Sequence, residues 1–446
     1  MRPGDLRDRL GRGRRGSRLR DPAKVAWPVG LAVAGAAWYA SDSLRHRREK
    51  GDGYAVPDEE VDVGSHAFLR AAEALTAAPI SWGDDVELLV NGDRIFPAYL
   101  ETIAGAQRSL NLLTYAYWRG DIADEVARAL CEKARSGVEV NVLLDAVGTA
   151  QMQPGLLRTI EEAGATISRF RPPKPYAFKS LSNRNHRKIL VADGSVGMIG
   201  GVGIAQEWTG NAQDPDHWRD THLRVRGPVV RGLQGAFAES WLEATGRVLV
   251  GDAHLPDLDR TADSGPMQLV RSRAGVGDTN VEALYYLAIA CAQRTLDLTA
   301  AYFAPRSAFI DALVEARKRG VAIRILVPGP HIDKPIVRAA GRAAYEELLE
   351  ADVEIYEYQP TMLHAKTLVV DGAWSSVGSV NFDNRSFQLH DEATLCVQSD
   401  ELAAQLTACF ETDLQVSERV RPGRWSERPL RHRAQERVLT LVRREL

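Results

Sequence analysis

The chain has 446 residues, of which 45% are hydrophobic and 26% charged, and this composition suits a globular protein and excludes an intrinsically disordered one. The net charge of −3 is uneven, because residues 1–50 carry 13 Lys and Arg against 5 Asp and Glu, which leaves −11 on residues 51–446. So acidic a body is a poor match for a nucleic-acid backbone, and we expect no nucleic-acid partner.

The first predicted element is an apolar run, Val25–Ala40, with no charged residue over 16 positions. As a helix it would be about 24 Å long, slightly short of the core of a bilayer. The aromatic residues Trp27 and Trp38 near its two ends are typical of a helix that crosses a membrane. We therefore predict a basic tail over residues 1–24, a transmembrane anchor over 25–44 and a linker over 45–80.

Two other interpretations of this run stay open. One is a secretory signal, although its basic leader would be long and it has no clear Ala-x-Ala cleavage site; the other is a helix lying on a membrane surface. Nine Lys and Arg precede the run and four follow it, within Arg45–Lys50. This bias places the N-terminus in the cytoplasm and the body of the protein outside.

Beyond residue 80, similar segments recur about 180 residues apart in the same order, and Ala106–Leu110 returns as Ala292–Leu296. Each is followed by a helix with apolar residues three to four apart, then by a continuous apolar strand, and then by a further strand. The predicted helices lie at 122–134 and 309–316, and the predicted strands at 138–144, 321–327, 165–170 and 353–358. A glycine that suits a helix C-cap follows each helix, Gly137 or Gly320.

This alternation predicts an α/β fold with two tandem α/β sandwich domains. We place them at residues 81–253 and 267–446, with a linker over 254–266. The basic C-terminal stretch Arg424–Leu446 is predicted to be helical, either docked on the body or in contact with a membrane surface.

One motif, His-x-Lys-x4-Asp, occurs once in each half, as His186/Lys188/Asp193 and His364/Lys366/Asp371. The apolar and β-branched residues around it favour a strand, on which side chains two apart share a face, so each His and Lys point into the same space. Each Asp instead precedes a glycine between two apolar runs, which is a hairpin-turn signal. Two matches at equivalent places are a strong signal. We predict chemical His/Lys pairs and structural aspartates.

A turn that begins with glycine follows each motif, Gly200–Gly203 in the first half and Gly378–Asn381 in the second. Small residues there let backbone N–H groups approach an anion closely. Lysine can also hold a phosphate oxygen through a compact point charge. We therefore predict a phosphate site whose contacts include Gly201, Gly203, Ser379 and Asn381.

The complete pattern, His-x-Lys-x4-Asp-x6-Gly-Ser-x-Asn, resembles the signature of the phospholipase D superfamily. Val377–Phe387 is similar to the bacterial cardiolipin synthase branch, as are Asn91-Gly92, Trp218–His222 and Tyr302–Pro305. The resemblance covers residues 80–446. It implies that the halves pack about a pseudo-twofold axis, that both motifs meet in one site, and that one histidine attacks phosphorus while the other serves as acid and base.

By this resemblance His186 is the nucleophile, although the sequence alone does not separate it from His364. Lys188, Lys366 and Asn381 would bind the non-bridging phosphate oxygens, and Asp220 and Glu392 would each orient a histidine. No metal or cofactor is implied. The cysteines agree with this, because they show no ligand spacing and are expected to be reduced: Cys131, Cys291, Cys396 and Cys409.

Two positions depart from the family pattern. Gly203 replaces the Asn of the first signature, and His390 stands where the synthase branch usually has Asn. Both changes bear on acceptor choice or rate, and neither removes a motif His or Lys.

The leading hypothesis is a cardiolipin synthase-like phosphatidyltransferase that converts two phosphatidylglycerols to cardiolipin and glycerol. The alternatives are a phospholipase D-type phosphodiesterase, less favourably a nuclease, and a membrane-tethered binding protein with a degraded site. The expected partners are phospholipids and the bacterial cytoplasmic membrane. The resemblance suggests that the body lies on the cytoplasmic face, whereas the charge bias suggests the opposite.

Overall fold

The computed structural model describes residues 61–173, 183–261, 265–274 and 278–426. The chain divides into two compact units, residues 1–52 and 53–446, and all the described residues belong to the second. The predicted tail (1–24) and anchor (25–44) lie outside the described residues, as does most of the predicted C-terminal helix. Within the described ranges, no helix is both long and apolar enough to cross a membrane.

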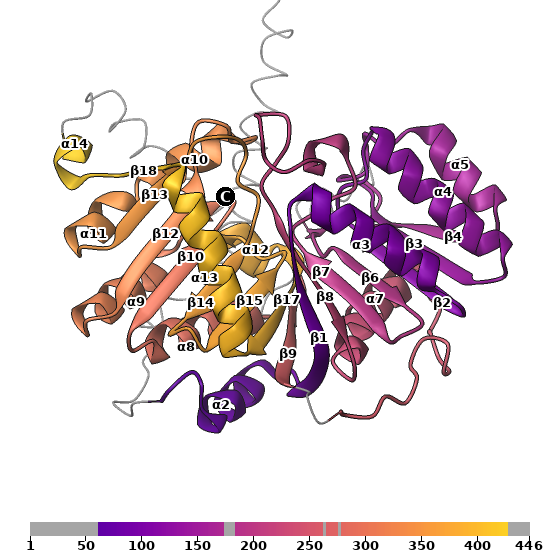
Figure 1. Ribbon diagram of the computed structural model, residues 1–446, viewed down its shortest axis with the longest axis horizontal. Coiled ribbons are helices and arrows are strands. Elements are labelled where there is room, and N and C mark those ends of the chain that lie inside the picture. Colours follow the sequence, from indigo (N-terminus) through magenta and orange to yellow (C-terminus); the bar gives the residue numbers. More distant parts are fainter. Residues whose placement is uncertain (1–60, 174–182, 262–264, 275–277, 427–446) are drawn as a thin grey trace, which may run out of the picture. The chain divides into compact units, whose positions relative to one another are not determined.

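The described residues form a mixed α/β fold around one large sheet of sixteen strands (Figure 1). Outward from the centre, the first half contributes β1 (Ser81–Val90), β8 (Thr221–Arg226), β7 (Val196–Gly200), β6 (Ile189–Ala192), β2 (Ser109–Thr114), β3 (Glu139–Asp145) and β4 (Thr166–Phe170). The second half contributes β9 (Gly265–Ser272), β17 (His390–Gln398), β15 (Trp374–Gly378), β14 (Thr367–Val370), β10 (Thr295–Thr299), β12 (Ala322–Pro328) and β13 (Glu354–Tyr358). The short strand β18 (Ser417–Arg419) extends the second half beyond β13. Strand order is therefore the same in the two halves.

The halves meet at the centre of the sheet, where β1 and β9 pair antiparallel through Ser81↔Met267 and Gly83↔Gly265. Three further short strands lie off this line. Strand β5 (Arg184–Asn185) pairs with β17, and β11 (Phe303–Ala304) and β16 (Phe382–Asp383) pair with each other as a separate two-stranded sheet. Because β5 belongs to the first half and β17 to the second, this pairing brings the first His-x-Lys segment against the other half.

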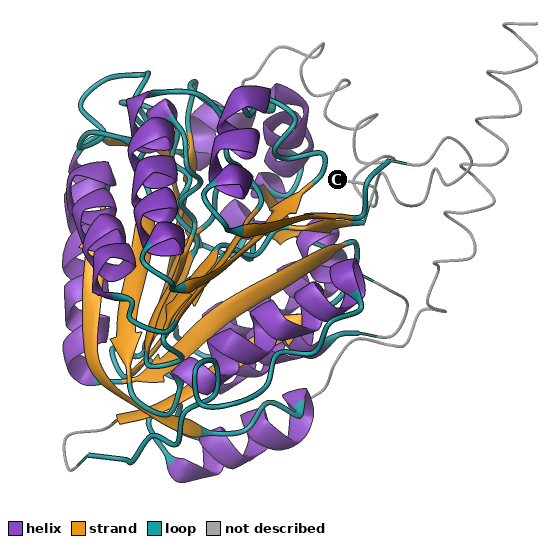
Figure 2. Ribbon diagram, turned by 90° about the vertical axis from the view of Figure 1, so that its right-hand side faces the viewer, coloured by secondary structure: helices purple, strands orange, loops and turns teal. Residues whose placement is uncertain are grey.

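Helices flank the strands on both sides (Figure 2). The first half contains α3 (Gly92–Gly105), α4 (Asp121–Arg135), α5 (Pro154–Glu162), the 3₁₀ turn η1 (Gln206–Trp208) and α7 (Val230–Thr245). The second contains α8 (Asn280–Cys291), α9 (Ser307–Lys318), α10 (Pro335–Arg342), α11 (Tyr345–Glu350), α12 (Asn384–Gln388), α13 (Asp400–Gln415) and α14 (Pro422–Ser426). Each half has a core under its own helices, and a third core contains residues of both halves, including Phe237 of α7 and Leu402 of α13.

Helix α4 illustrates how the sequence produces these elements. Its buried residues Ile122, Val126 and Leu130 recur every four positions, which is the spacing of one helical face. Asp121 lies in its first turn and Arg135 in its last, where each charge complements the helix dipole. The predicted helix over 122–134 is confirmed, and the predicted helices and strands listed above agree with the structure within two residues at each end.

Three predicted boundaries differ from the structure. The His-x-Lys segments precede their strands rather than lie within them, since β6 begins at Ile189 and β14 at Thr367. The predicted linker 45–80 contains helix α2 (His66–Thr76), whose Phe68 is fully buried and packs edge-on against Trp374. The predicted linker 254–266 reaches into β9, which begins at Gly265.

Candidate active site

Both His-x-Lys segments lie where the two halves meet, and each is bonded to the backbone of the opposite half. The amide of His186 donates to the carbonyl of Asp391 at 2.9 Å, and the amide of His364 donates to the carbonyl of Arg219 at 2.7 Å. Main-chain hydrogen bonds therefore fix both segments before any side chain is considered. The four predicted residues His186, Lys188, His364 and Lys366 are all buried.

Each histidine is paired with the acid of the other half. Nδ1 of His186 lies 3.1 and 3.2 Å from the two carboxylate oxygens of Glu392, and it also lies 3.1 Å from the carbonyl of Ser379. Nδ1 of His364 lies 2.7 Å from Oδ2 of Asp220. A carboxylate bonded to Nδ1 fixes the tautomer that leaves Nε2 with its lone pair.

The two acids are held by different donors. Glu392 accepts hydrogen bonds from the hydroxyls of Ser386, at 2.8 Å, and of Ser379. Asp220 accepts instead from the indole Nε1–H of Trp208 at 2.9 Å and from its neighbouring backbone amide at Thr221. Although they occupy equivalent sequence positions, Asp220 and Glu392 therefore have different environments.

Arg187, the residue between His186 and Lys188, also positions the site. Its guanidinium is fully buried and donates to three carbonyls, those of Glu392 at 3.1 Å, Ala236 at 3.0 Å and Ser272 at 2.8 Å. These acceptors lie in both halves, so Arg187 ties the first His-x-Lys segment to β17 and β9.

The site lysines bond to their own segments. Lys188 Nζ donates to the carbonyl of His186 at 2.7 Å, and Lys366 Nζ lies 2.9 Å from Nδ1 of His364 as well as contacting its carbonyl. Burial lowers the pKa of Lys366 to about 8, and burial together with the positive charge of Lys366 lowers the pKa of Lys188 well below its usual value. The charge of Lys366 thus acts on Lys188, although the two lysines come from different halves of the chain.

Burial also sets the protonation of the histidines. It lowers the pKa of His364 to about 4 and that of His186 well below its usual value. Burial would raise the pKa of Glu392, but the imidazole and hydrogen bond of His186 outweigh it, so that this carboxyl remains ionised. Asp220 behaves in the same way towards His364, and its pKa is lowered. At neutral pH the site therefore holds two neutral imidazoles facing two carboxylates.

The four residues predicted to bind phosphate, Asn381, Ser379, Gly201 and Gly203, differ in their surroundings. Asn381 is buried, and its Oδ1 has no hydrogen-bond partner among the described residues. Ser379 bonds instead to Glu392. At Gly201 a Cβ atom would lie 2.1 Å from Oδ1 of Asp220, and at Gly203 it would lie 2.7 Å from Cβ of Ala116. Glycine at these two positions therefore lets other residues of the protein pack closely against the backbone.

The Asp-Gly pairs form hairpin turns, as their sequence signal predicted. Asp193 and Asp371 have φ values of 52° and 55°, each is followed by a glycine with positive φ, and each joins two antiparallel strands. Each carboxylate accepts three backbone N–H groups at the start of a paired strand, β2 for Asp193 and β10 for Asp371.

Three aromatic residues pack near the histidines, and of these only Trp218 lies in a segment on which the family resemblance rests. Tyr115 packs edge-on against His186 with ring centroids 4.9 Å apart, and Trp208 packs edge-on against His364 at 5.2 Å. Trp218 lies 5.5 Å from the same histidine. Their positions follow from tertiary packing, which only the spatial arrangement reveals.

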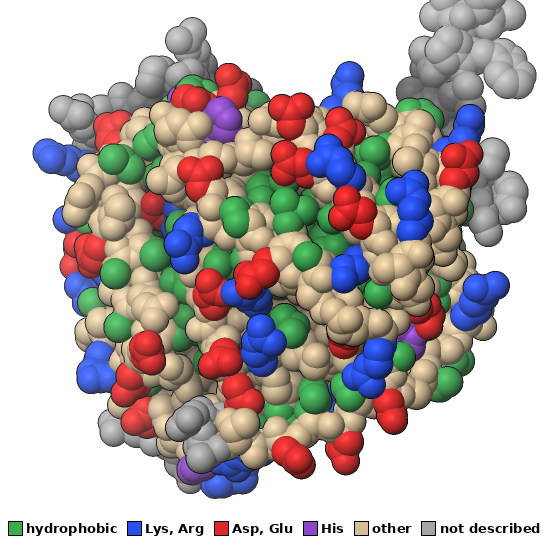
Figure 3. Space-filling view, turned by 45° about the vertical axis from the view of Figure 1, so that its right-hand side comes forward, with side chains coloured by type: hydrophobic (Ala, Val, Ile, Leu, Met, Phe, Trp, Pro, Cys, Tyr) green, Lys and Arg blue, Asp and Glu red, His purple; other side chains and the backbone are tan. Residues whose placement is uncertain are grey.

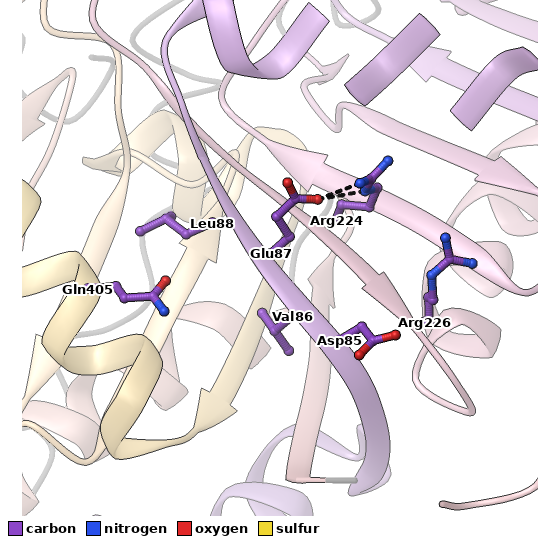
Figure 4. Close-up of a pocket in the computed structure, with 7 residues that line it drawn as sticks. All are labelled: Asp85, Val86, Glu87, Leu88, Arg224, Arg226 and Gln405. Carbon is purple, nitrogen blue, oxygen red and sulfur yellow. Dashed lines mark hydrogen bonds and ion pairs between the residues drawn. The ribbon is translucent and has the colours of Figure 1, made fainter. Parts of the chain in front are cut away.

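A separate pocket lies over β1, β8 and α13 (Figure 4). It is lined by Asp85, Val86, Glu87, Leu88, Arg224, Arg226 and Gln405. Arg224 is already bound to Glu87 at 2.7 Å. The pocket contains none of the predicted site residues.

Comparison with known proteins agrees with this fold and site. The family profile "Cardiolipin synthase, PLD-like domain" matches residues 99–214 and 286–414, and so spans both His-x-Lys segments. A cardiolipin synthase of Geobacillus sp. (strain WCH70) is 34% identical over 388 residues, covering 86% of this chain and 77% of that protein. A cardiolipin synthase of Alkalihalophilus pseudofirmus is 31% identical over 448 residues, covering 95% and 89%. The crystal structure of a phosphatidylserine synthase from Haemophilus influenzae has the same fold, with a TM-score of 0.65 at 13% identity, and covers 85% of this chain and all of that one.

The paired site in a twice-repeated α/β fold thus defines a member of the phospholipase D superfamily. Within it, the chain belongs to the family of the cardiolipin synthase, PLD-like domain.

Proposed function

We propose that this protein is a phosphatidyltransferase of the cardiolipin synthase type, which transfers the phosphatidyl group of one phosphatidylglycerol to the free hydroxyl of another and releases glycerol. The observation that carries the proposal is the crossed pairing of His186 with Glu392 and of His364 with Asp220. It provides two oriented imidazoles from two halves, as a two-step displacement requires.

In the first step, Nε2 of His186 attacks phosphorus while the P–O bond to glycerol breaks. Glu392 holds the Nδ1 proton and stabilises the positive charge that develops on the ring. His364 protonates the departing oxygen. A buried neutral imidazole gains its proton more readily beside an anion, so binding of the phosphodiester supplies His364 with the charged form it needs.

In the second step, the hydroxyl of the acceptor lipid attacks the phosphohistidine. His364 takes the hydroxyl proton, the P–N bond breaks, and His186 returns to its neutral form. Lys188, Lys366 and the amide of Asn381 stabilise the non-bridging oxygens, whose charge is greatest as the bonds to phosphorus change. The reaction is a transfer and not a hydrolysis because an alcohol, instead of water, attacks the phosphohistidine.

The direct test is incubation of the purified protein with phosphatidylglycerol, with products followed by mass spectrometry. Cardiolipin and glycerol should form in equal amounts, and His186→Ala and His364→Ala should each abolish them. His217→Ala is the matched control, because His217 also pairs with an acid, Asp214 at 2.7 Å, but lies at the surface. Phosphatidic acid without cardiolipin would contradict transfer and favour the hydrolase.

Surface charge disfavours a nuclease. On the face in Figure 3, acidic and basic side chains are interspersed rather than gathered into a basic patch. A nucleic-acid backbone requires an excess of positive charge along its path.

The membrane part of the proposal rests on the sequence. We assign residues 25–44 as the anchor that holds the enzyme at the bacterial cytoplasmic membrane. Deletion of residues 25–44 should move the protein from the carbonate-washed membrane fraction to the supernatant, whereas deletion of 427–446 should not. Retention of the first variant on membranes would contradict the anchor.

A further inference from the structure

His186, His390 and Glu392 bring three metal-ligating atoms together beside the proposed nucleophile. One nitrogen of each histidine and one carboxylate oxygen all lie within 4.8 Å of one another. We infer that these residues form a binding site for a single Zn²⁺-type ion, and that an ion bound there reversibly stops phosphatidyl transfer.

The fold builds the cluster from both halves. His390 and Glu392 are two residues apart on β17, so their side chains share one face of the sheet. Strand β5 runs parallel to β17 with Arg184 opposite His390, and the amide of His186 then bonds to Asp391 at 2.9 Å. This register places His186 over the gap between the two β17 side chains.

The distances leave room for an ion. Nδ1 of His186 lies 3.1 Å from Oε1 of Glu392, and Nδ1 of His390 lies 3.6 Å from the same oxygen. The imidazole centroids are 5.5 Å apart. Nδ1 of His390 is buried and faces Glu392 at 3.6 Å, slightly beyond hydrogen-bond length, so coordination to an ion would satisfy it. The side chain of His390 is 14% exposed, which provides a path for the ion to enter.

The chemistry of this ligand set suits zinc. Two imidazoles and one carboxylate are a zinc-binding set that leaves a fourth position open, and the ligands must be neutral imidazoles and an ionised carboxylate. The oxygen Oε1 of Glu392 lies near Nδ1 of both imidazoles, so the three candidate ligand groups face one another.

Neighbouring charges limit the affinity. The positive charge of Lys188 acts on His186, and those of Arg385 and Lys334 act on His390. Glu392 and, on the other side of the site, Asp220 attract a cation. Because the lysines and arginine oppose a dication, we expect reversible binding and not a permanently held metal.

A bound ion would disable the nucleophile. It replaces the Nδ1 proton of His186, which is released to solvent, and its positive charge withdraws electron density from the ring. Nε2 then attacks phosphorus less readily. This consequence rests on the proposed function, whereas ion binding does not. The ion is an inhibitor and takes no part in the reaction, so the expectation of a metal-free mechanism is unchanged.

The binding test uses the full-length protein in detergent, freed of metal with a chelator and titrated with Zn²⁺ against a chromophoric zinc indicator. We expect the wild type to bind one ion per chain. His390→Asn should bind zinc at least about tenfold more weakly than the wild type. His217→Asn, which removes a histidine from another His/Asp pair, should bind zinc as the wild type does. Thermal unfolding without zinc checks that both variants fold, and His390→Gln replaces His390→Asn if it does not. Equal affinity in the variant and the wild type, or no binding at all, would overturn the site.

The inhibition test compares each protein with its own zinc-free rate of cardiolipin formation. Zinc should suppress the wild-type rate, a chelator should restore it, and His390→Asn should need at least about tenfold more zinc for the same suppression. Equal zinc sensitivity in the variant would overturn the inhibitory role. A protein that forms no cardiolipin would refute the proposed function, and the indicator titration would still decide whether the metal site exists.

Discussion

Trp208 explains why the first half lacks the asparagine found in the second. A Cβ atom at Gly203 would lie 2.7 Å from Cβ of Ala116 and 3.0 Å from the Trp208 ring, so these two residues together occupy the space that a side chain at 203 would need. The same indole donates its N–H to Asp220, which in turn orients His364. The departure at Gly203 therefore accompanies a hydrogen bond from Trp208 that holds Asp220 in the first half.

Trp208→Phe tests this role. It removes one hydrogen bond to a carboxylate, worth roughly 1.5–3 kcal/mol, and should lower kcat/KM by about tenfold to a hundredfold. Loss of the donor should also raise the pKa of Asp220. Because the carboxylate is lost as pH falls, the acid limb of the kcat/KM profile should move to higher pH.

Trp118→Phe is the matched control, because Trp118 lies 5.2 Å from Trp208 but donates its N–H to the carbonyl of Gly148 at 2.7 Å. Its pH profile should be that of the wild type. Identical acid limbs in all three proteins would contradict the positioning role of Trp208.

Lys366 should set the alkaline limit of the reaction. Burial lowers its pKa to about 8, so its ammonium is present below that pH and lost as pH rises through it. Lys188, whose pKa is also lowered, loses its charge in the same direction, so the alkaline limb of kcat/KM should have its midpoint near pH 8 or below. A profile that stays flat beyond the usual pKa of lysine would show that Lys366 is not the charge that binds phosphate.

At the scale of elements, the helices and strands around the sheet could be predicted closely, because apolar spacing and terminal glycines are local signals. Helix α4 and strand β3 are examples. The His-x-Lys segments were wrongly placed within strands. The amides of His186 and His364 bond to Asp391 and Arg219 of the opposite half, and no local pattern records a contact between halves.

The hairpin aspartates should stabilise the fold and take no part in the chemistry. Asp193 accepts the backbone N–H groups of Gln107, Arg108 and Ser109 at 2.7 to 2.9 Å. Asp193→Ala leaves these donors without their charged acceptor and should lower the free energy of unfolding by about 3 kcal/mol, measured by urea denaturation.

Asp193→Asn is the paired variant, since asparagine tolerates the positive φ of the turn and keeps one side-chain acceptor. It should lose less stability than the alanine variant. A loss of activity at wild-type stability would instead give Asp193 a chemical role.

At the scale of the whole molecule, the family resemblance implied that both motifs share one site, but the sequence did not indicate which acid serves which histidine. Glu392 is 206 residues from His186, and Asp220 is 144 residues from His364. Both pairs form where the two halves of the chain are in contact. The docking of α2 on the second half and the approach of His390 to His186 are likewise tertiary contacts.

The crossed arrangement makes the roles of the two histidines separable by experiment. A phosphatidyl donor with p-nitrophenol as leaving group needs no general acid for the first step. His364→Asn should therefore release p-nitrophenol once and then stall, because no base activates the acceptor. His186→Asn should release none.

The most direct measurement is mass spectrometric mapping of the protein after His364→Asn has reacted with this donor. We expect a phosphatidyl group on His186. A label on another residue, or p-nitrophenol release without any covalent label, would contradict it.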